Sequence, residues 1–175
     1  MTWFALPTYT DSALTTAHLM MIRDNINESA ASRATTAGRW FASTGPYAIA
    51  EREIVAAVVS GSDTTDHTEY VPLTPPGPNV TITTGVLAMV SIQSQANNDT
   101  AGPSSRHSFS ITGATTVEAD DDWSCLSQNS ASYDTRYGIC TLKTMSPGSN
   151  TFTSLYRVSS GTGHWQDREM IVWGL

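Results

Sequence analysis

Short runs of alternating side chains fill the chain after about residue 51. In residues 80–84, Val80 and Ile82 alternate with threonines, and residues 107–111 and 152–158 repeat the same two-residue period. Successive side chains of a β-strand point to opposite faces, so this period predicts strands with one buried face and one solvated face. Turn residues such as Pro75-Pro76-Gly77-Pro78 separate the runs. The pattern restricts this part of the chain to an all-β fold.

The number and spacing of these runs predict the architecture. Many short strands with closely spaced turns are typical of an antiparallel β-sandwich that resembles a jelly roll, and no helical pattern between them suggests a parallel sheet. We expect the last two strands, within residues 150–159 and 169–175, to pair and close a sheet. The eight predicted strands lie in residues 54–59, 68–74, 80–84, 86–92, 107–111, 133–139, 152–158 and 170–173.

The first fifty residues follow a different pattern. Trp3, Phe4, Leu6, Pro7 and Tyr9 form a short apolar arm. Apolar residues then recur at helical spacing, so we expect one α-helix that is capped by Asp11 or Thr15 and ends near residue 34. Such a helix has to dock, either on its own domain or on neighbouring subunits. Its apolar stripe contains Leu14, Ala17, Leu19, Met21, Ile22 and Ile26, together with Asn25.

This change of pattern predicts two domains. Residues 1–50 would hold the arm, the helix and a linker over residues 40–50, with a turn at Gly45-Pro46. We expect this region to serve attachment and oligomerisation. Residues 51–175 would form the β-sandwich domain.

Charge and hydropathy limit which partners we expect the chain to bind and where we expect it to be synthesised. The formal net charge is −7, and no cluster of Lys or Arg is present, so we expect no binding to nucleic acid. No segment approaches the roughly 20 apolar residues that a membrane helix needs, and we expect no membrane partner. The N-terminus lacks the basic and apolar regions of a signal peptide, which predicts synthesis in a cytoplasm.

Residues that could perform catalysis or hold a metal are scattered. The four histidines (His18, His67, His107 and His164) have no metal-ligand spacing, and neither a Gly-x-Ser-x-Gly elbow nor a distinct carboxylate pair is present. We therefore expect a non-enzymatic protein with no cofactor and no resident metal. The Asp120-Asp121-Asp122 run allows two interpretations, a solvated loop or a Ca²⁺ site.

Cysteines and aromatic residues also leave alternatives open. Cys125 and Cys140 are either two free and mostly buried thiols or a disulfide that forms outside the reducing cytosol. The aromatic residues either fill the core and interfaces, which we favour, or line a sugar-binding face. They are Trp40, Phe41, Tyr47, Trp123, Tyr133, Tyr137, Trp165 and Trp173.

Two segments near the chain ends carry recognisable motifs. The first comprises Trp3, Thr16-Ala17, Leu19 and Ile22-Arg23-Asp24-Asn25. The second comprises Thr151-Phe152-Thr153, Tyr156-Arg157, the turn Gly161-Thr162-Gly163, Arg168-Glu169 and Val172. Together they resemble virion structural proteins of actinobacterial tailed phages, which have an Ile-Arg-Asp-Asn-Leu helix and a Thr-Phe-Thr-x-x-Tyr-Arg strand. Here Met20 replaces the usual Asn, and Ile26 replaces Leu.

The resemblance implies a structural protein on the virion surface. The expected function is capsid decoration on the phage head, with the N-terminal region anchored to the major capsid lattice. The expected partners are the major capsid protein and copies of the chain itself, as a homotrimer. The alternative is a tail-tip or tail-fibre component that binds a host surface receptor or glycan. The residues expected to bind partners are Trp3, Phe4, Leu6, Tyr9, Leu14, Leu19, Met21, Ile22, Arg23, Asn25 and Ile26.

Overall fold

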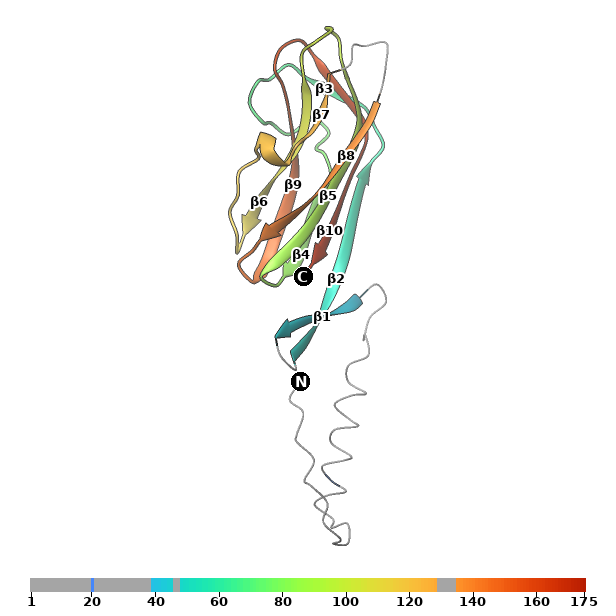
Figure 1. Cartoon of the computed structure of the whole chain (residues 1–175). Coiled ribbons are helices and arrows are strands. Elements are labelled where there is room, and N and C mark those ends of the chain that lie inside the picture. Colours follow the sequence, from blue (N-terminus) through green and yellow to red (C-terminus); the bar gives the residue numbers. More distant parts are fainter. Residues whose placement is uncertain (1–19, 21–38, 46–47, 129–134) are drawn as a thin grey trace. The chain divides into compact units, whose positions relative to one another are not determined.

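Two antiparallel sheets make up the part of the chain that the computed structural model describes, residues 20, 39–45, 48–128 and 135–175 (Figure 1). A single short 3₁₀ helix, η1 (Asp121–Trp123), accompanies the strands there. No helix among these residues has the length and apolar character that crossing a membrane requires. The strands are β1 (Arg39–Gly45), β2 (Ala48–Val59), β3 (Asp63–Thr65), β4 (Asn79–Thr84), β5 (Leu87–Asn98), β6 (Ser105–Gly113), β7 (Cys125–Ser127), β8 (Thr135–Thr144), β9 (Gly148–Val158) and β10 (Gly163–Gly174).

The strand order confirms the predicted jelly-roll-like sandwich. One sheet has the order β1-β2-β10-β5-β8, with β3 also paired to β10, and the other has the order β4-β9-β6-β7. Strands that are neighbours in the sequence mostly lie in different sheets, so the chain passes repeatedly from one layer to the other. This winding is typical of a jelly roll, in which two Greek keys form two packed sheets.

Two details of the strand prediction are wrong, and a third is not confirmed. Residues 40–50 were expected to be a linker, but β1 and the start of β2 lie there, because Trp40, Phe41 and Thr44 favour extended backbone. Residues 68–74 form no strand and make one isolated bridge, between Val71 and Tyr156. The count of eight is not confirmed, since the described residues form ten strands and include the short β3.

The pairing expected at the C-terminus is also wrong. β9 pairs with β4 and β6 in the smaller sheet, whereas β10 pairs with β2, β3 and β5 in the larger one. The two strands face each other across the core, where the Tyr156 and Trp165 rings meet edge to face at 5.3 Å. Placing both apolar faces inward from opposite layers buries more surface than a hairpin within one layer.

The core lies between the sheets and follows the strict alternation of the strands. On β5 every second residue is buried, from Ala88 to Asn98, and β4 and β9 alternate in the same way. The smaller sheet contributes Phe109 and Phe152, whose ring centroids lie 6.2 Å apart. Residues of the main core cluster include Val80, Ile82, Ala88, Val90, Ile92, Phe109, Ile111, Phe152, Met170 and Val172.

The chain divides into two units, residues 1–52 and 53–175. The larger unit contains the packed sandwich. The predicted arm and α-helix, apart from Met20, lie outside the described residues, so the helix and the domain boundary at residue 50 stay predictions.

Candidate functional site

The residues expected to bind partners, from Trp3 to Ile26, lie outside the described residues. Within the described ranges, polar side chains gather in two places that sequence patterns did not predict. One is a network around Asp121 on the outer side of the smaller sheet. The other is a buried group around His107 inside the sandwich.

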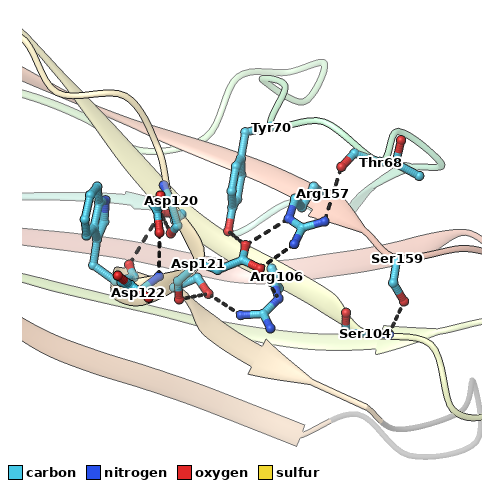
Figure 2. A network of polar contacts seen from close by, with 12 residues as sticks. Thr68, Tyr70, Ser104, Arg106, Asp120, Asp121, Asp122, Arg157 and Ser159 are labelled. Carbon is cyan, nitrogen blue, oxygen red and sulfur yellow. Dashed lines mark hydrogen bonds and ion pairs between the residues drawn. The ribbon is translucent and has the colours of Figure 1, made fainter.

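Asp121 is the centre of the outer network (Figure 2). The Tyr70 hydroxyl donates to Asp121 Oδ1 at 2.8 Å, and Arg157 Nε donates to the same oxygen at 3.0 Å. Arg157 Nη2 bonds Asp121 Oδ2, and Arg106 Nε lies 3.4 Å from that oxygen. Arg106 Nη1 also donates to the Ser124 hydroxyl at 2.8 Å. Two arginines and a phenol therefore surround one carboxylate.

The sheet register explains why the two arginines meet. Arg106 on β6 and Arg157 on β9 are directly opposite partners, so both side chains stand on the same face. Asp120 caps η1 by accepting the Asp122 amide at 2.9 Å, which presents Asp121 to the pair. The Ser108 hydroxyl on β6 donates to the Asp120 carbonyl at 2.9 Å and fixes this turn to the sheet.

The charges in this network support one another. The Arg157 guanidinium beside Asp121 holds the pKa of that carboxyl below its ordinary value. Burial, with the added effect of the Asp121 carboxylate, raises the pKa of Tyr70 to about 12. Tyr70 is therefore a proton donor in its hydrogen bond at neutral pH, and Asp121 is an anion.

The network joins segments that are distant in sequence. Arg157 Nη1 also donates to the Thr68 carbonyl at 3.3 Å, so the sheet holds both η1 and the segment around Tyr70. The polar atoms of Asp121 are directed at protein donors. Among the described residues, no group of three or more His, Cys, Asp or Glu is placed to hold a metal ion. The geometry makes this cluster a clamp between two loops and a sheet.

His107 forms the centre of the buried group. Its ring nitrogens lie 3.2 Å from the Ser94 hydroxyl and 3.0 Å from the Ser154 hydroxyl, and its ring stacks on Tyr156 at 4.6 Å. Burial, together with the positive charge of Arg168, lowers the pKa of His107 to about 3. The imidazole is therefore neutral at physiological pH and links the two sheets through two serines.

Arg168 is fully buried beside this group. Its Nη2 donates to the Gly61 carbonyl at 3.1 Å, and its guanidinium carbon lies 5.8 Å from the centre of the Tyr156 ring. The sequence contains a signal for this placement, since Arg168 shares the two-residue phase of Met170 and Val172, which face the core. The burial of Arg168 was nevertheless not predicted, because arginine is rarely buried.

Both cysteines are free thiols, as one of the two interpretations of the sequence expected. Cys125 faces the core from β7, and burial raises the pKa of its thiol to about 11. Cys140 is exposed on β8, on the outward face of the other sheet. Cys125 points into the core from the smaller sheet, whereas Cys140 points outward from the larger sheet, so the two residues do not form a disulfide.

Of the aromatic residues named from the sequence, six are described, and three of these, Trp123, Tyr137 and Trp165, pack in or against the core, which is the placement we favoured. Trp165 is buried in a second apolar cluster with Tyr156 and Val158, and Tyr137 packs against both this cluster and the main one. Trp123 packs on the main core, and Lys143 Nζ lies 3.0 Å from the centre of its ring. Trp173 is only partly buried and points outward from β10. Tyr47 and Tyr133 lie outside the described residues.

A shallow polar cleft of about 160 Å³ lies where Asn97 of β5 pairs with His164 of β10. It contains no pair of carboxylates. The lining residues are Ser62, Gln95, Asn97, His164, Trp165 and Gln166.

Comparisons with known proteins give no family. No family model matches the chain, and no curated protein matches it by sequence.

Solved structures match in fold only. Eiger TNF from S. frugiperda is 10% identical, with a TM-score of 0.46, over 70% of this chain and 92% of that one. A structure of infectious bursal disease virus, Gx strain, is 9% identical, with a TM-score of 0.47, over 76% of this chain and 37% of that one. A carbohydrate-binding module from Cellvibrio mixtus lichenase 5A is 11% identical, with a TM-score of 0.32, over 81% of this chain and 92% of that one.

Replacing Asp121→Asn should remove the clamp's charge. Since the Asp121 side chain is 38% exposed, we expect a loss of about 1 kcal/mol in the free energy of unfolding at pH 7. A carboxyl whose folded pKa is lowered stabilises above its unfolded pKa and loses that effect as pH falls through the folded value. The difference between wild type and variant should therefore shrink below about pH 4. Urea unfolding at several pH values measures it. Asp122→Asn removes the same charge from the exposed side chain next to Asp121 and is the control, and an equal loss there would contradict the clamp.

Acid should destabilise the fold through His107. The unfolded imidazole takes up a proton near its ordinary pKa of about 6.5, whereas the folded one resists until about pH 3. The unfolded state therefore binds more protons in this pH range. The contribution of His107 to the free energy of unfolding falls by up to about 1.4 kcal/mol for each unit by which the pH is lowered. NMR titration of the folded protein should show His107 without a protonation step above pH 4. A His107 midpoint near 6 would refute the assignment.

Proposed function

We propose that this chain is a non-enzymatic structural protein of a phage virion, displayed on the capsid surface as a decoration protein. In this proposal the N-terminal region anchors the chain to the major capsid lattice, and the protein forms a homotrimer. The sandwich faces solvent. The observation that carries the proposal is the pair of motifs at the two ends of the chain, Ile22-Arg23-Asp24-Asn25 and residues 150–158 with 168–172.

The fold supports the proposal through the place of the second motif. Its residues form β9 and β10, which are interior strands of the two sheets. Tyr156 and Trp165 meet in the core, and Arg157 holds the outer clamp. The motif therefore specifies the framework of the sandwich. A fold alone does not select a function, and jelly rolls occur in viral capsid and lectin domains alike.

The two polar clusters are in keeping with a structural role. In the outer cluster the Asp121 carboxylate is bound by Tyr70 and Arg157. In the inner cluster His107 is buried and neutral at physiological pH. A catalytic acid or base has to reach a substrate, whereas these groups bind other parts of the same chain.

Copy number per particle tests the location. A decoration protein repeats with the capsid lattice, so purified virions should hold on the order of hundreds of copies. Quantitative mass spectrometry of peptides from this chain and from the major capsid protein measures the ratio. A handful of copies per virion would replace the capsid assignment with the tail-tip or tail-fibre alternative, in which the chain binds a host receptor or glycan.

Binding to empty capsids tests the anchor. In the full-length protein, Ile22→Asp places a charge in the predicted apolar stripe and should reduce co-sedimentation with capsids at least tenfold, because a charge is costly to bury at an interface. Asn27→Asp adds the same charge on the predicted polar side and should bind like the wild type. Equal binding by all three proteins would contradict attachment through this region.

A further inference from the structure

The outward face of the larger sheet is apolar in its lower rows. The register aligns Ile54, Trp173, Met89 and Leu142 in one row across β2, β10, β5 and β8. The next row is Ala56, Ile171, Ser91 and Cys140, and the third is Val58, Glu169, Gln93 and Gly138. We call these three rows the outer face. All of its residues belong to the unit formed by residues 53–175.

These side chains point away from the core. Their neighbours along the strands, such as Val172 and Val90, are fully buried in the main cluster, so the alternate residues face outward. Val58 is 61% exposed, Leu142 57% and Ile54 44%. A contiguous apolar patch of this kind on a single chain marks a contact surface.

The smaller sheet provides an internal comparison. Its outward positions hold Thr81 and Thr83 on β4, Thr151 and Thr153 on β9, and Arg106 on β6. That face is polar, as expected for an antiparallel sheet with one side in water. By contrast, β2 and β10 contain continuous apolar runs at residues 54–59 and 170–173, which are typical of strands covered on both faces.

The size of the outer face fits an interface between protein chains. Four strands about 4.8 Å apart and three rows about 7 Å apart span about 400 Å². A stable interface takes about 800 Å² from each partner, with an apolar centre and a polar rim. The first two rows of the outer face, about 270 Å², supply such a centre. The polar rim includes Glu169 and Gln93 of the third row and the ion pair between Arg136 and Asp167.

The lack of charge in the first two rows of the outer face allows a second copy of the same chain to cover it. The protein carries a net charge of −7, so two copies repel one another over most of their surfaces. The first two rows of the outer face contain no charged side chain, which removes that repulsion where they touch.

We infer that the outer face of β2, β10, β5 and β8 is a self-association interface, and that a second copy of this chain covers Ile54, Val58 and Leu142. This inference rests on the proposed function only for self-association. It places a contact on the sandwich in addition to the N-terminal region. If the capsid assignment fails, the inferred interface is unaffected, because it concerns the purified protein.

Cys140 provides the test, because it is exposed in a single chain and lies in the second row. In the full-length wild type, a second copy should cover this thiol and slow its reaction with a disulfide reagent such as DTNB. In Val58→Glu, a buried charge would disrupt the contact from β2, on the far side of the face. Cys140 should then react at least tenfold faster, and light scattering should show a lower mass than for the wild type.

Thr83→Glu is the matched control. Thr83 is also β-branched and exposed, and the change adds the same charge on the opposite sheet. It should leave Cys140 slow. Far-ultraviolet circular dichroism and urea unfolding establish that each variant is folded, and Cys125, buried in the core, should stay unreactive in all of them.

Each other outcome overturns the inference. A fast Cys140 in the wild type means that no copy covers the face, whatever the mass of the particle. A slow Cys140 in both the wild type and Val58→Glu means that something other than this face protects the thiol. A fast Cys140 in Thr83→Glu as well means that added charge, not the outer face, controls the reaction.

Discussion

The inward side chains of the two sheets depend on each other, because neither sheet can bury them alone. Phe109 and Phe152 from the smaller sheet need Val90 and Val172 from the larger one, and all four are fully buried. This mutual burial requires the chain to cross repeatedly between layers, and it places β9 opposite β10 rather than beside it. Every other feature of the domain, from the loop clamp to the outer face, is positioned by that crossing pattern.

The packing is not apolar throughout. His107, Ser94 and Ser154 form hydrogen bonds inside the sandwich, and Arg168 lies buried beside them. Buried polar groups are costly unless they are paired, so they favour one arrangement of the strands over alternatives. The group therefore contributes specificity to the match between the sheets, whereas Phe109 and its neighbours contribute most of the burial.

The outward faces of the two sheets differ in chemistry. The smaller sheet presents threonines and arginines, and the paired Arg106 and Arg157 bind Asp121 to hold two loops in place. The larger sheet presents Ile54, Leu142 and their neighbours to the outside. The two layers of the sandwich therefore present a polar surface on one side and an apolar surface on the other.

The sequence by itself determined that residues 51–175 are β-structure in two packed layers, because the two-residue period of segments such as 80–84 leaves no other way to bury one face. It also contained two patterns that only the tertiary structure explained. One is the alternation that places Arg168 on the same face as Met170 and Val172, and the other is the continuous apolar run of residues 54–59. The tertiary structure decided which strands pair, which arginines meet Asp121 and which thiol is exposed. Those outcomes depend on register and on contacts between segments such as Tyr70 and Arg157, far apart in the chain. Local periodicity records only which face a residue takes, and not the partner across it.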